Sequence, residues 1–177
     1  GYGVERNLTL QTARHVYEVL SGTEEYDPIP VLLTGNAQQW DYYQTPGDML
    51  FLPNVDSIVK ALHKAPAAIE EVEALRNRSA DILVKYASGS ANANAQKRSL
   101  DDLARMIDQA FIALQGRPGE DGQLQQELEA HKIPYNGSGH KPAHIAVNKV
   151  QTLEVWKRNG FQGPHQLVLS KRAFELS

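Results

Sequence analysis

The sequence predicts an α/β fold, a layered domain with a mostly parallel sheet. Three observations predict it. Segments with apolar residues at helical spacing alternate along the chain with short apolar or β-branched segments. The run from Ala110 to Leu114 is unbroken and apolar, which is typical of a strand covered on both faces. A glycine-rich turn at Gly116–Gly122 then precedes another helix pattern. In such folds, ligands bind beyond the carboxyl ends of the strands.

The first part of the chain predicts a helix, a hairpin and two further helices. Leu8 to Leu20 carries apolar residues at helical spacing, with Asn7 as N-cap and Gly22 as the stop. The run Ile29–Thr34 and the aromatic segment 38–43 predict paired strands joined by a turn at Gly35–Asn36. Short helices are predicted over Val55–His63 and Pro66–Arg76, and Ser79–Ala87 fits either a helix or a strand.

The second part predicts further alternation. Residues 87–96 are small and polar, so they indicate a surface loop or a family-specific insertion. Ser99 is expected to cap a helix that runs to Met106, and Ala110–Leu114 is expected to be the central strand. The remaining expected elements are a helix over Gln123–His131, a short strand at Ile133–Tyr135, a helix over Lys149–Asn159 capped by Gly160, and a last strand at His165–Leu169.

Composition and charge narrow the class of protein. The chain has 177 residues, of which 41% are hydrophobic and 22% charged, and no apolar run approaches the ~20 residues that span a bilayer. We therefore expect a soluble globular protein with no membrane partner. A net charge of -3 gives no basic field for a nucleic acid, and the absence of cysteine excludes disulfides and thiolate chemistry. No leader-like segment opens the chain, so we expect no signal peptide and a cytoplasmic location.

Two glycine-containing loops are candidate ligand sites, because each precedes a helix and presents backbone N–H groups at the positive end of a helix dipole. One is the stretch from Gly1 to Glu5, and the other is the Gly116–Gly122 turn. Neither is followed by the Gly-Lys-Ser/Thr of a phosphate-binding loop. The alternative, which the residues leave open, is a pair of tight turns whose acids cap helices.

The segments that contain these loops resemble a known protein family. The segments "FIALQGRPGEDGQLQQELEAHKIPYNGSG" and "AVNKVQTLEVWKRNGFQGPHQLVLSK" resemble the N-terminal domain and hinge of D-alanine:D-alanine ligases. That family has a strand, H-G-x-x-G-E-D-G, a helix, I-P-Y-x-G-S-G, and then M-D-K with a further helix. The opening "GYGVERNLTLQTARHV" and the segment "IPVLLTGNAQQWDYY" are also similar to the family, while residues 54 to 100 are not matched in detail.

The resemblance implies an ATP-grasp ligase. ATP phosphorylates the carboxylate of one D-alanine, and the amine of a second attacks the acylphosphate to form the dipeptide used in peptidoglycan. Glu5 matches the glutamate that orients the first D-alanine, with helix capping as the alternative. Lys149 matches a lysine that contacts ATP phosphate, with an ordinary exposed helix-start lysine as the alternative. Gly116–Gly122 would form a wall of the first alanine site, with substrate contacts expected at Gln115, Gly116, Gly119 and Glu120.

The resemblance also implies the domain organisation. We expect a Rossmann-like (pre-ATP-grasp) substrate-binding domain over 1–140 that lacks its first strand, with an insertion at about 64–100, and a hinge helix with the start of the central ATP-grasp domain over 141–177. ATP and Mg²⁺ would be bound mainly by parts of the enzyme outside this chain. The chain alone is therefore expected to be inactive, and the full enzyme is expected to be a homodimer.

Departures from the family pattern bear on the substrate. Gln115 replaces a histidine, Asn7 an acid, Gly3 a small hydroxyl residue and Asn148 the aspartate before the hinge lysine. A ligase that uses another D-amino or D-hydroxy acid would tolerate these changes better than a strict dipeptide synthase. Two rival functions stay open: a stand-alone domain that binds a small ligand without turnover, and an oligomerisation domain.

Other side chains give weaker indications. His140 and His144 stand four residues apart with Pro142 between them, and no third ligand has suitable spacing, so no metal site is assigned. Trp40, Tyr42 and Tyr43 could form a ligand platform, but aromatic residues on a hairpin favour packing or a subunit contact, of which we prefer the subunit contact.

Overall fold

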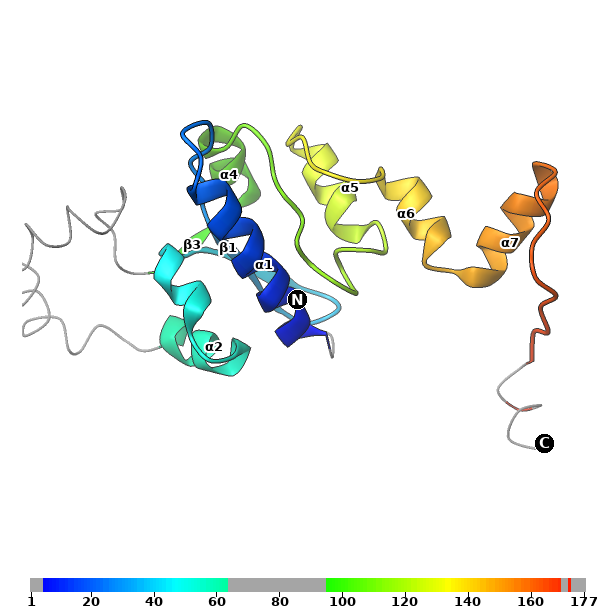
Figure 1. Ribbon diagram of the computed structural model, residues 1–177, viewed down its shortest axis with the longest axis horizontal. Coiled ribbons are helices and arrows are strands. Elements are labelled where there is room, and N and C mark those ends of the chain that lie inside the picture. The colour runs from blue at the N-terminus through cyan, green and yellow to red at the C-terminus, as the bar shows by residue number, and fades with distance from the viewer. Residues whose placement is uncertain (1–4, 64–94, 170–171, 173–177) are drawn as a thin grey trace, which may run out of the picture.

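The fold is known from a computed structural model, which describes residues 5–63, 95–169 and 172. In chain order the elements are α1 (Arg6–Ser21), β1 (Val31–Gly35), β2 (Trp40–Gln44), a 3-10 helix η1 (Gly47–Phe51), α2 (Val55–His63), β3 (Gln96–Arg98), α4 (Leu100–Met106), α5 (Gln123–Ala130), α6 (His140–Ala146) and α7 (Lys149–Arg158). Helices α5, α6 and α7 follow one another toward one end of the molecule, away from α2 (Figure 1).

Several expectations fall outside the described residues. These are the opening turn with Gly3, the helix at Pro66–Arg76, the element at Ser79–Ala87 and most of the loop at 87–96.

The sheet corrects the predicted topology. Among the described residues it has three strands in the order β1-β2-β3, and both pairings are antiparallel. Leu33 pairs with Tyr42, and Tyr42 pairs in turn with Arg98. The expectation of a mostly parallel sheet is therefore wrong. Strand β3 was not predicted because Gln-Lys-Arg has no apolar alternation, and its backbone hydrogen bonds to β2 define it instead.

Within the part of the chain that the structure describes, the expected central strand at Ala110–Leu114 forms only one parallel bridge, between Ala110 and Tyr135. The short strand expected at Ile133–Tyr135 is likewise reduced to this bridge. The backbone explains why. Ala110 N–H donates to the carbonyl of Pro134, but a proline has no N–H to return to a ladder. Ile112 N–H donates to Asn136 Oδ1 at 2.6 Å, so a side chain replaces the next ladder bond. Phe111 is 56% exposed, which contradicts the expectation of a strand covered on both faces.

The predicted last strand at His165–Leu169 is also wrong. The segment has no regular secondary structure, and its apolar side chains Leu167 and Val168 are 81% and 64% exposed. An apolar, β-branched composition favours a strand only where a neighbouring strand completes the ladder.

The predicted helices are confirmed where the structure describes them, but the N-cap predicted for the first helix is wrong. Helix α1 begins at Arg6, one residue before Asn7, and the Asn7 side chain accepts the N–H of Val55 instead of capping α1. Ser99 caps α4 in a capping box, because its hydroxyl accepts the Asp102 N–H while the Asp102 carboxylate accepts the Ser99 N–H. Asn148 caps α7 through its side-chain oxygen. Helix α6 was not predicted, since Pro142 is a helix breaker in most positions. Here Pro142 lies in the first turn, where its missing N–H costs no hydrogen bond.

Two apolar clusters form the core. The larger contains Leu33 of β1 with leucines of α4 and α5 and Ile133. The smaller contains Leu10, Leu50 and Ile58, which join α1, η1 and α2. Arg14 of α1 binds the end of η1, because its guanidinium donates to the carbonyls of Leu50 and Leu52. Helix α1 is thereby fixed, and with it the position of Glu5 at its start.

Candidate functional site

Glu5 lies against the glycine-rich turn. It occupies the N-cap position of α1, but its side chain makes no capping hydrogen bond. The carboxylate instead lies beside Gly116, where a methyl group added to the glycine Cα would overlap Glu5 Oε2. Gly116 has φ 71°, a left-handed conformation that glycine adopts without strain. The structure therefore brings two sequence-predicted residues, 111 positions apart in the chain, into direct proximity and leaves the carboxylate exposed.

Gln115 connects the same turn to α1. Its backbone N–H donates to Thr9 Oγ1 at 3.1 Å, and its side-chain Nε2 donates to Thr12 Oγ1 at 2.9 Å. Both threonines lie on the helix that begins beside Glu5. Gln115 thus fixes the distance between α1 and the turn, and its amide is committed to the protein.

The turn is closed by its own backbone and by buried side chains. Glu120 N–H donates to the Gly116 carbonyl at 3.0 Å, while the Glu120 side chain is exposed. Asp121 is 4% exposed; it accepts hydrogen bonds from Gln123 and pairs with Arg117 at 3.3 Å. Gly119 is buried so closely against Leu114 that an added Cβ would lie 2.8 Å from the Leu114 carbonyl oxygen.

A further loop that contains glycines, Tyr135–Gly139, is held by Glu129 of α5. The Glu129 carboxylate accepts hydrogen bonds from the Tyr135 hydroxyl at 2.5 Å, from the His140 N–H at 3.1 Å and from His140 Nδ1. These bonds, the one from Tyr135 first, lower the pKa of Glu129 to about 2. Burial and the neighbouring carboxylate raise the pKa of Tyr135 to about 12. The loop is therefore fixed at both ends by one carboxylate.

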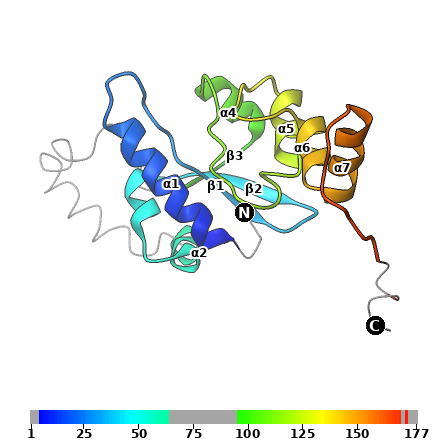
Figure 2. The same ribbon diagram turned by 45° about the vertical axis from the view of Figure 1, so that its right-hand side comes forward.

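Lys149 does not join this group. It is exposed and opens α7, which packs against α6. Helices α5 and α6 lie between α1 and α7 in both views (Figures 1 and 2). The predicted site residues thus divide into Glu5 with the Gln115–Glu120 turn on one side and Lys149 on the other.

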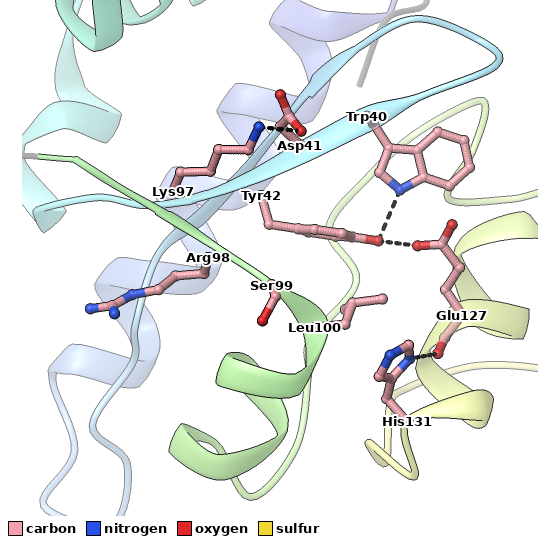
Figure 3. Close-up of a pocket in the computed structure, with 9 residues that line it drawn as sticks. All are labelled: Trp40, Asp41, Tyr42, Lys97, Arg98, Ser99, Leu100, Glu127 and His131. Carbon is pink, nitrogen blue, oxygen red and sulfur yellow. Dashed lines mark hydrogen bonds and ion pairs between the residues drawn. The ribbon is translucent and has the colours of Figure 1, made fainter.

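A groove of about 550 Å³ lies elsewhere, between β2, β3 and α5. Figure 3 shows its side chains bonded to one another: Trp40 Nε1 donates to the Tyr42 hydroxyl, which donates to Glu127 at 2.5 Å, and Lys97 pairs with Asp41 at 2.8 Å. Burial, with the Glu127 carboxylate second, raises the pKa of Tyr42. Trp40 and Tyr42 also pack against the larger core cluster. Their bonds and packing serve the fold, so we do not assign the groove as the functional site.

Sequence reasoning missed several residues that shape the site. Thr9, Thr12 and Glu129 were not singled out, and neither was Gln125, which donates from Nε2 to the Gly119 carbonyl. A signal for Gln125 existed. It lies on the face of α5 that carries the buried Leu124 and Leu128, so a polar residue stands where the helical period calls for an apolar one.

Two further observations concern metals and membranes. In the described ranges, no three histidine or acidic side chains come together as a metal site. None of the helices in those ranges is long and apolar enough to cross a bilayer.

Comparison with known proteins identifies relatives. Residues 1–138 match the family model described as the D-ala D-ala ligase N-terminus. The chain is 39% identical over 112 residues to a D-alanine–D-alanine ligase of Alcanivorax borkumensis, covering 56% of this chain and 36% of that protein.

Similar proteins from other bacteria give the same result. A D-alanine–D-alanine ligase of Pseudomonas entomophila is 36% identical over 107 residues, which cover 60% of this chain and 31% of the relative. One from Ectopseudomonas mendocina is 46% identical over 67 residues, which cover 38% of this chain and 21% of the relative. The chain thus spans between 21% and 36% of the length of these curated relatives.

Proposed function

The chain belongs to the D-alanine–D-alanine ligase family, and we propose that it is the N-terminal, substrate-binding part of an ATP-dependent ligase. In the proposed reaction, the γ-phosphoryl group of ATP passes to a carboxylate oxygen of the first D-alanine and ADP leaves. The amine of a second D-alanine then attacks the acyl carbon, phosphate leaves, and the amine loses a proton as the peptide bond forms. The product would serve peptidoglycan synthesis in the cytoplasm.

The observation that carries this proposal is the placement of the Glu5 carboxylate beside Gly116. An exposed carboxylate that makes no helix-capping bond is available to an ammonium group. We assign Glu5 to pairing with the ammonium of the first D-alanine, which would direct that substrate's carboxylate toward the incoming phosphoryl group. Its contribution is orientation, since it neither donates nor accepts the transferred group.

The turn supplies the wall of the proposed D-alanine site. Gly116 lets the backbone approach a small substrate, and the exposed Glu120 lies at the edge of the turn. Gly119 is buried against Leu114, so we assign it to the close packing of the turn. Gln115 holds this wall at a fixed distance from Glu5 through Thr9 and Thr12. Where the family pattern has histidine, a glutamine bonded in this way provides position without a proton that titrates near neutral pH. We therefore include D-hydroxy acids with D-amino acids as candidate substrates.

Among the described residues, we assign Lys149 to contact with ATP. Its exposed ammonium at the start of α7 suits a phosphate group. The described residues do not fit a Mg²⁺ site, so we assign them no step that involves the metal. The family match ends at residue 138, which agrees with a domain boundary near 140 and with α7 as the hinge helix.

The test is phosphate release by the full-length protein with ATP and D-alanine, D-serine or D-lactate. We expect release with at least one of them. In Glu5→Gln, kcat/KM for D-alanine or D-serine should fall about 100-fold, because the ammonium group of the amino acid loses its charged partner, while the KM for ATP should change little.

Glu18→Gln is the matched control, since Glu18 is an exposed acid on the same helix. Wild-type kinetics in Glu5→Gln would contradict the assignment of Glu5. No substrate-dependent phosphate release by the wild-type protein would contradict the ligase and favour a domain that binds without turnover.

A further inference from the structure

Gln125 is a buried polar residue in a position where an apolar one would pack as well. It is 6% exposed and lies on α5 between Leu124, also 6% exposed, and Leu128, which is 4% exposed. Its Nε2 donates to the Gly119 carbonyl at 2.5 Å, while its Oε1 is buried and has no hydrogen-bond partner in the described structure. A leucine at this position would remove the unpaired Oε1 but would also leave the Gly119 carbonyl without this donor. The amide thus leaves one acceptor of its own unpaired while it satisfies an acceptor of the turn, which favours a geometric role for it.

The geometry of the turn identifies that role. Gly116 and Glu120 are joined by one backbone hydrogen bond, and Leu124 N–H donates to the Pro118 carbonyl at 3.2 Å. The Gly119 carbonyl lies between these two bonds, and Gln125 is the side chain that holds it. Leu114 fills the space beside Gly119, since an added Cβ would lie 2.5 Å from the Leu114 Cβ. The amide of Gln125 and the packing of Leu114 thus both restrict the position of Gly119.

We propose that Gln125 is a positioning residue for the D-alanine site: by holding the Gly119 carbonyl, it fixes the Gly116–Glu120 turn against which Glu5 lies. The inference rests on the proposed function and deepens it, because it names the residue that sets the shape of the substrate wall. Gln125 acts through the backbone of the turn and has no contact with the reacting atoms.

The chemistry of the bond gives a test that a packing role would not pass. A glutamate at 125 keeps the size of glutamine, but its carboxylate cannot donate to a carbonyl, whereas its protonated form can. Burial raises the pKa of a carboxyl group, so a glutamate here would become a donor as the pH falls toward 6. The charged side chains of the turn are Arg117 and Asp121, which pair with each other, and Glu120. Helix α6, which packs against α5, carries the titratable side chains of His140, Lys141 and His144. Because these groups are also present in the wild-type protein, the rate of phosphate release by each variant is compared with that of wild type at the same pH.

The experiment measures phosphate release by full-length wild type, Gln125→Glu, Gln125→Met and Gln126→Glu between pH 6 and pH 9. Gln126 is the control because it is the exposed neighbour on the same helix. We expect Gln125→Met to lose about 10-fold to 100-fold in kcat/KM for D-alanine, with the KM for ATP within about twofold of wild type. Gln125→Glu should show a similar loss in kcat/KM at pH 9 and should regain most of the wild-type kcat/KM at pH 6. Gln126→Glu should match the wild-type protein at every pH.

Equal losses for D-alanine and ATP with no recovery at low pH would overturn the proposal, and so would wild-type kinetics in both variants. Variants that do not fold would assign Gln125 to stability and would overturn it as well. Hydrogen exchange at the Glu120 amide is the second measurement, and we expect it to accelerate about 10-fold or more in folded Gln125→Met, because the turn then opens more often. If the wild-type protein releases no phosphate, the ligase assignment fails, and this exchange rate alone decides whether Gln125 holds the turn.

Discussion

At the scale of single residues, Gly116 is the position where an added methyl group would meet the Glu5 carboxylate. Its φ of 71° disfavours any L side chain, and a Cβ would overlap Glu5 Oε2. We expect Gly116→Ala to cost about 1 kcal/mol of stability from backbone strain and to displace the Glu5 carboxylate. The KM for D-alanine of the full-length protein should rise about 10-fold.

Gly160→Ala is the matched control for Gly116→Ala. Gly160 has φ 79°, but an added Cβ would meet no atom within 4 Å. It should show a similar loss in Tm with unchanged kinetics. An equal KM for D-alanine in Gly116→Ala and Gly160→Ala would show that Gly116 does not shape the substrate site.

Glu129 gives a prediction about pH. Its pKa is lowered from the ordinary value of 4.5 to about 2 in the folded protein. A group whose folded pKa is depressed stabilises the fold fully above its unfolded pKa, and that stabilisation is lost as the pH falls from about 4.5 through about 2. The Tm of Glu129→Gln should therefore lie below that of wild type at pH 6, and the difference should shrink steadily toward pH 2.

Thermal melts of both proteins across this pH range make the measurement, with Glu18→Gln of α1 as the control for loss of an exposed acid. A difference in Tm that stays constant from pH 6 to pH 2 would show that the Glu129 carboxylate is not held by Tyr135 and His140 in its charged form.

At the scale of elements, one hydrogen bond joins the sheet to α5. The hydroxyl of Tyr42 on β2 donates to Glu127 on α5 at 2.5 Å, and both side chains are half-buried. We expect Tyr42→Phe to lower the free energy of unfolding by about 1–3 kcal/mol, because it leaves a carboxylate oxygen without its donor.

A double-mutant cycle with Glu127→Gln measures this coupling by urea unfolding. The loss in the double variant should be smaller than the sum of the single losses, since each single change already breaks the bond. Additive losses would mean that the two elements are held together by the apolar cluster alone.

The same scale shows why some elements could be predicted and others could not. Helices α1, α4, α5 and α7 follow from residues close in sequence, namely apolar spacing and caps such as Ser99 and Asn148. The segment 110–114 has the composition of a buried strand, but its ladder depends on distant partners. Pro134 and the side chain of Asn136 decide its backbone hydrogen bonds, and neither is visible in the segment's own pattern.

At the scale of the whole molecule, we expect the full-length protein to form a homodimer, measured as its mass by light scattering over a concentration series. Two of the three aromatic residues that suggested a contact are used within the chain, since Trp40 and Tyr42 pack on the larger core cluster and Trp40 donates to Tyr42. Trp40→Ala should therefore lower the free energy of unfolding by about 3 kcal/mol and leave the dimer mass unchanged. A monomeric wild-type protein would contradict the dimer, and a monomeric Trp40→Ala with wild-type stability would place Trp40 at the interface.

The amino-acid sequence by itself determined the family, helices α1, α2, α4, α5 and α7, the β1-β2 hairpin and the identity of Glu5 and the Gly116–Gly122 turn as candidates, because these depend on motifs and on local spacing. Tertiary structure decided which candidates meet. Contact between Glu5 and Gly116 depends on how α1 docks through Arg14, Thr9 and Thr12, and the antiparallel sheet depends on which backbone groups find partners. Hydrogen bonds between residues distant in sequence have no local signature, so only the folded chain fixes them.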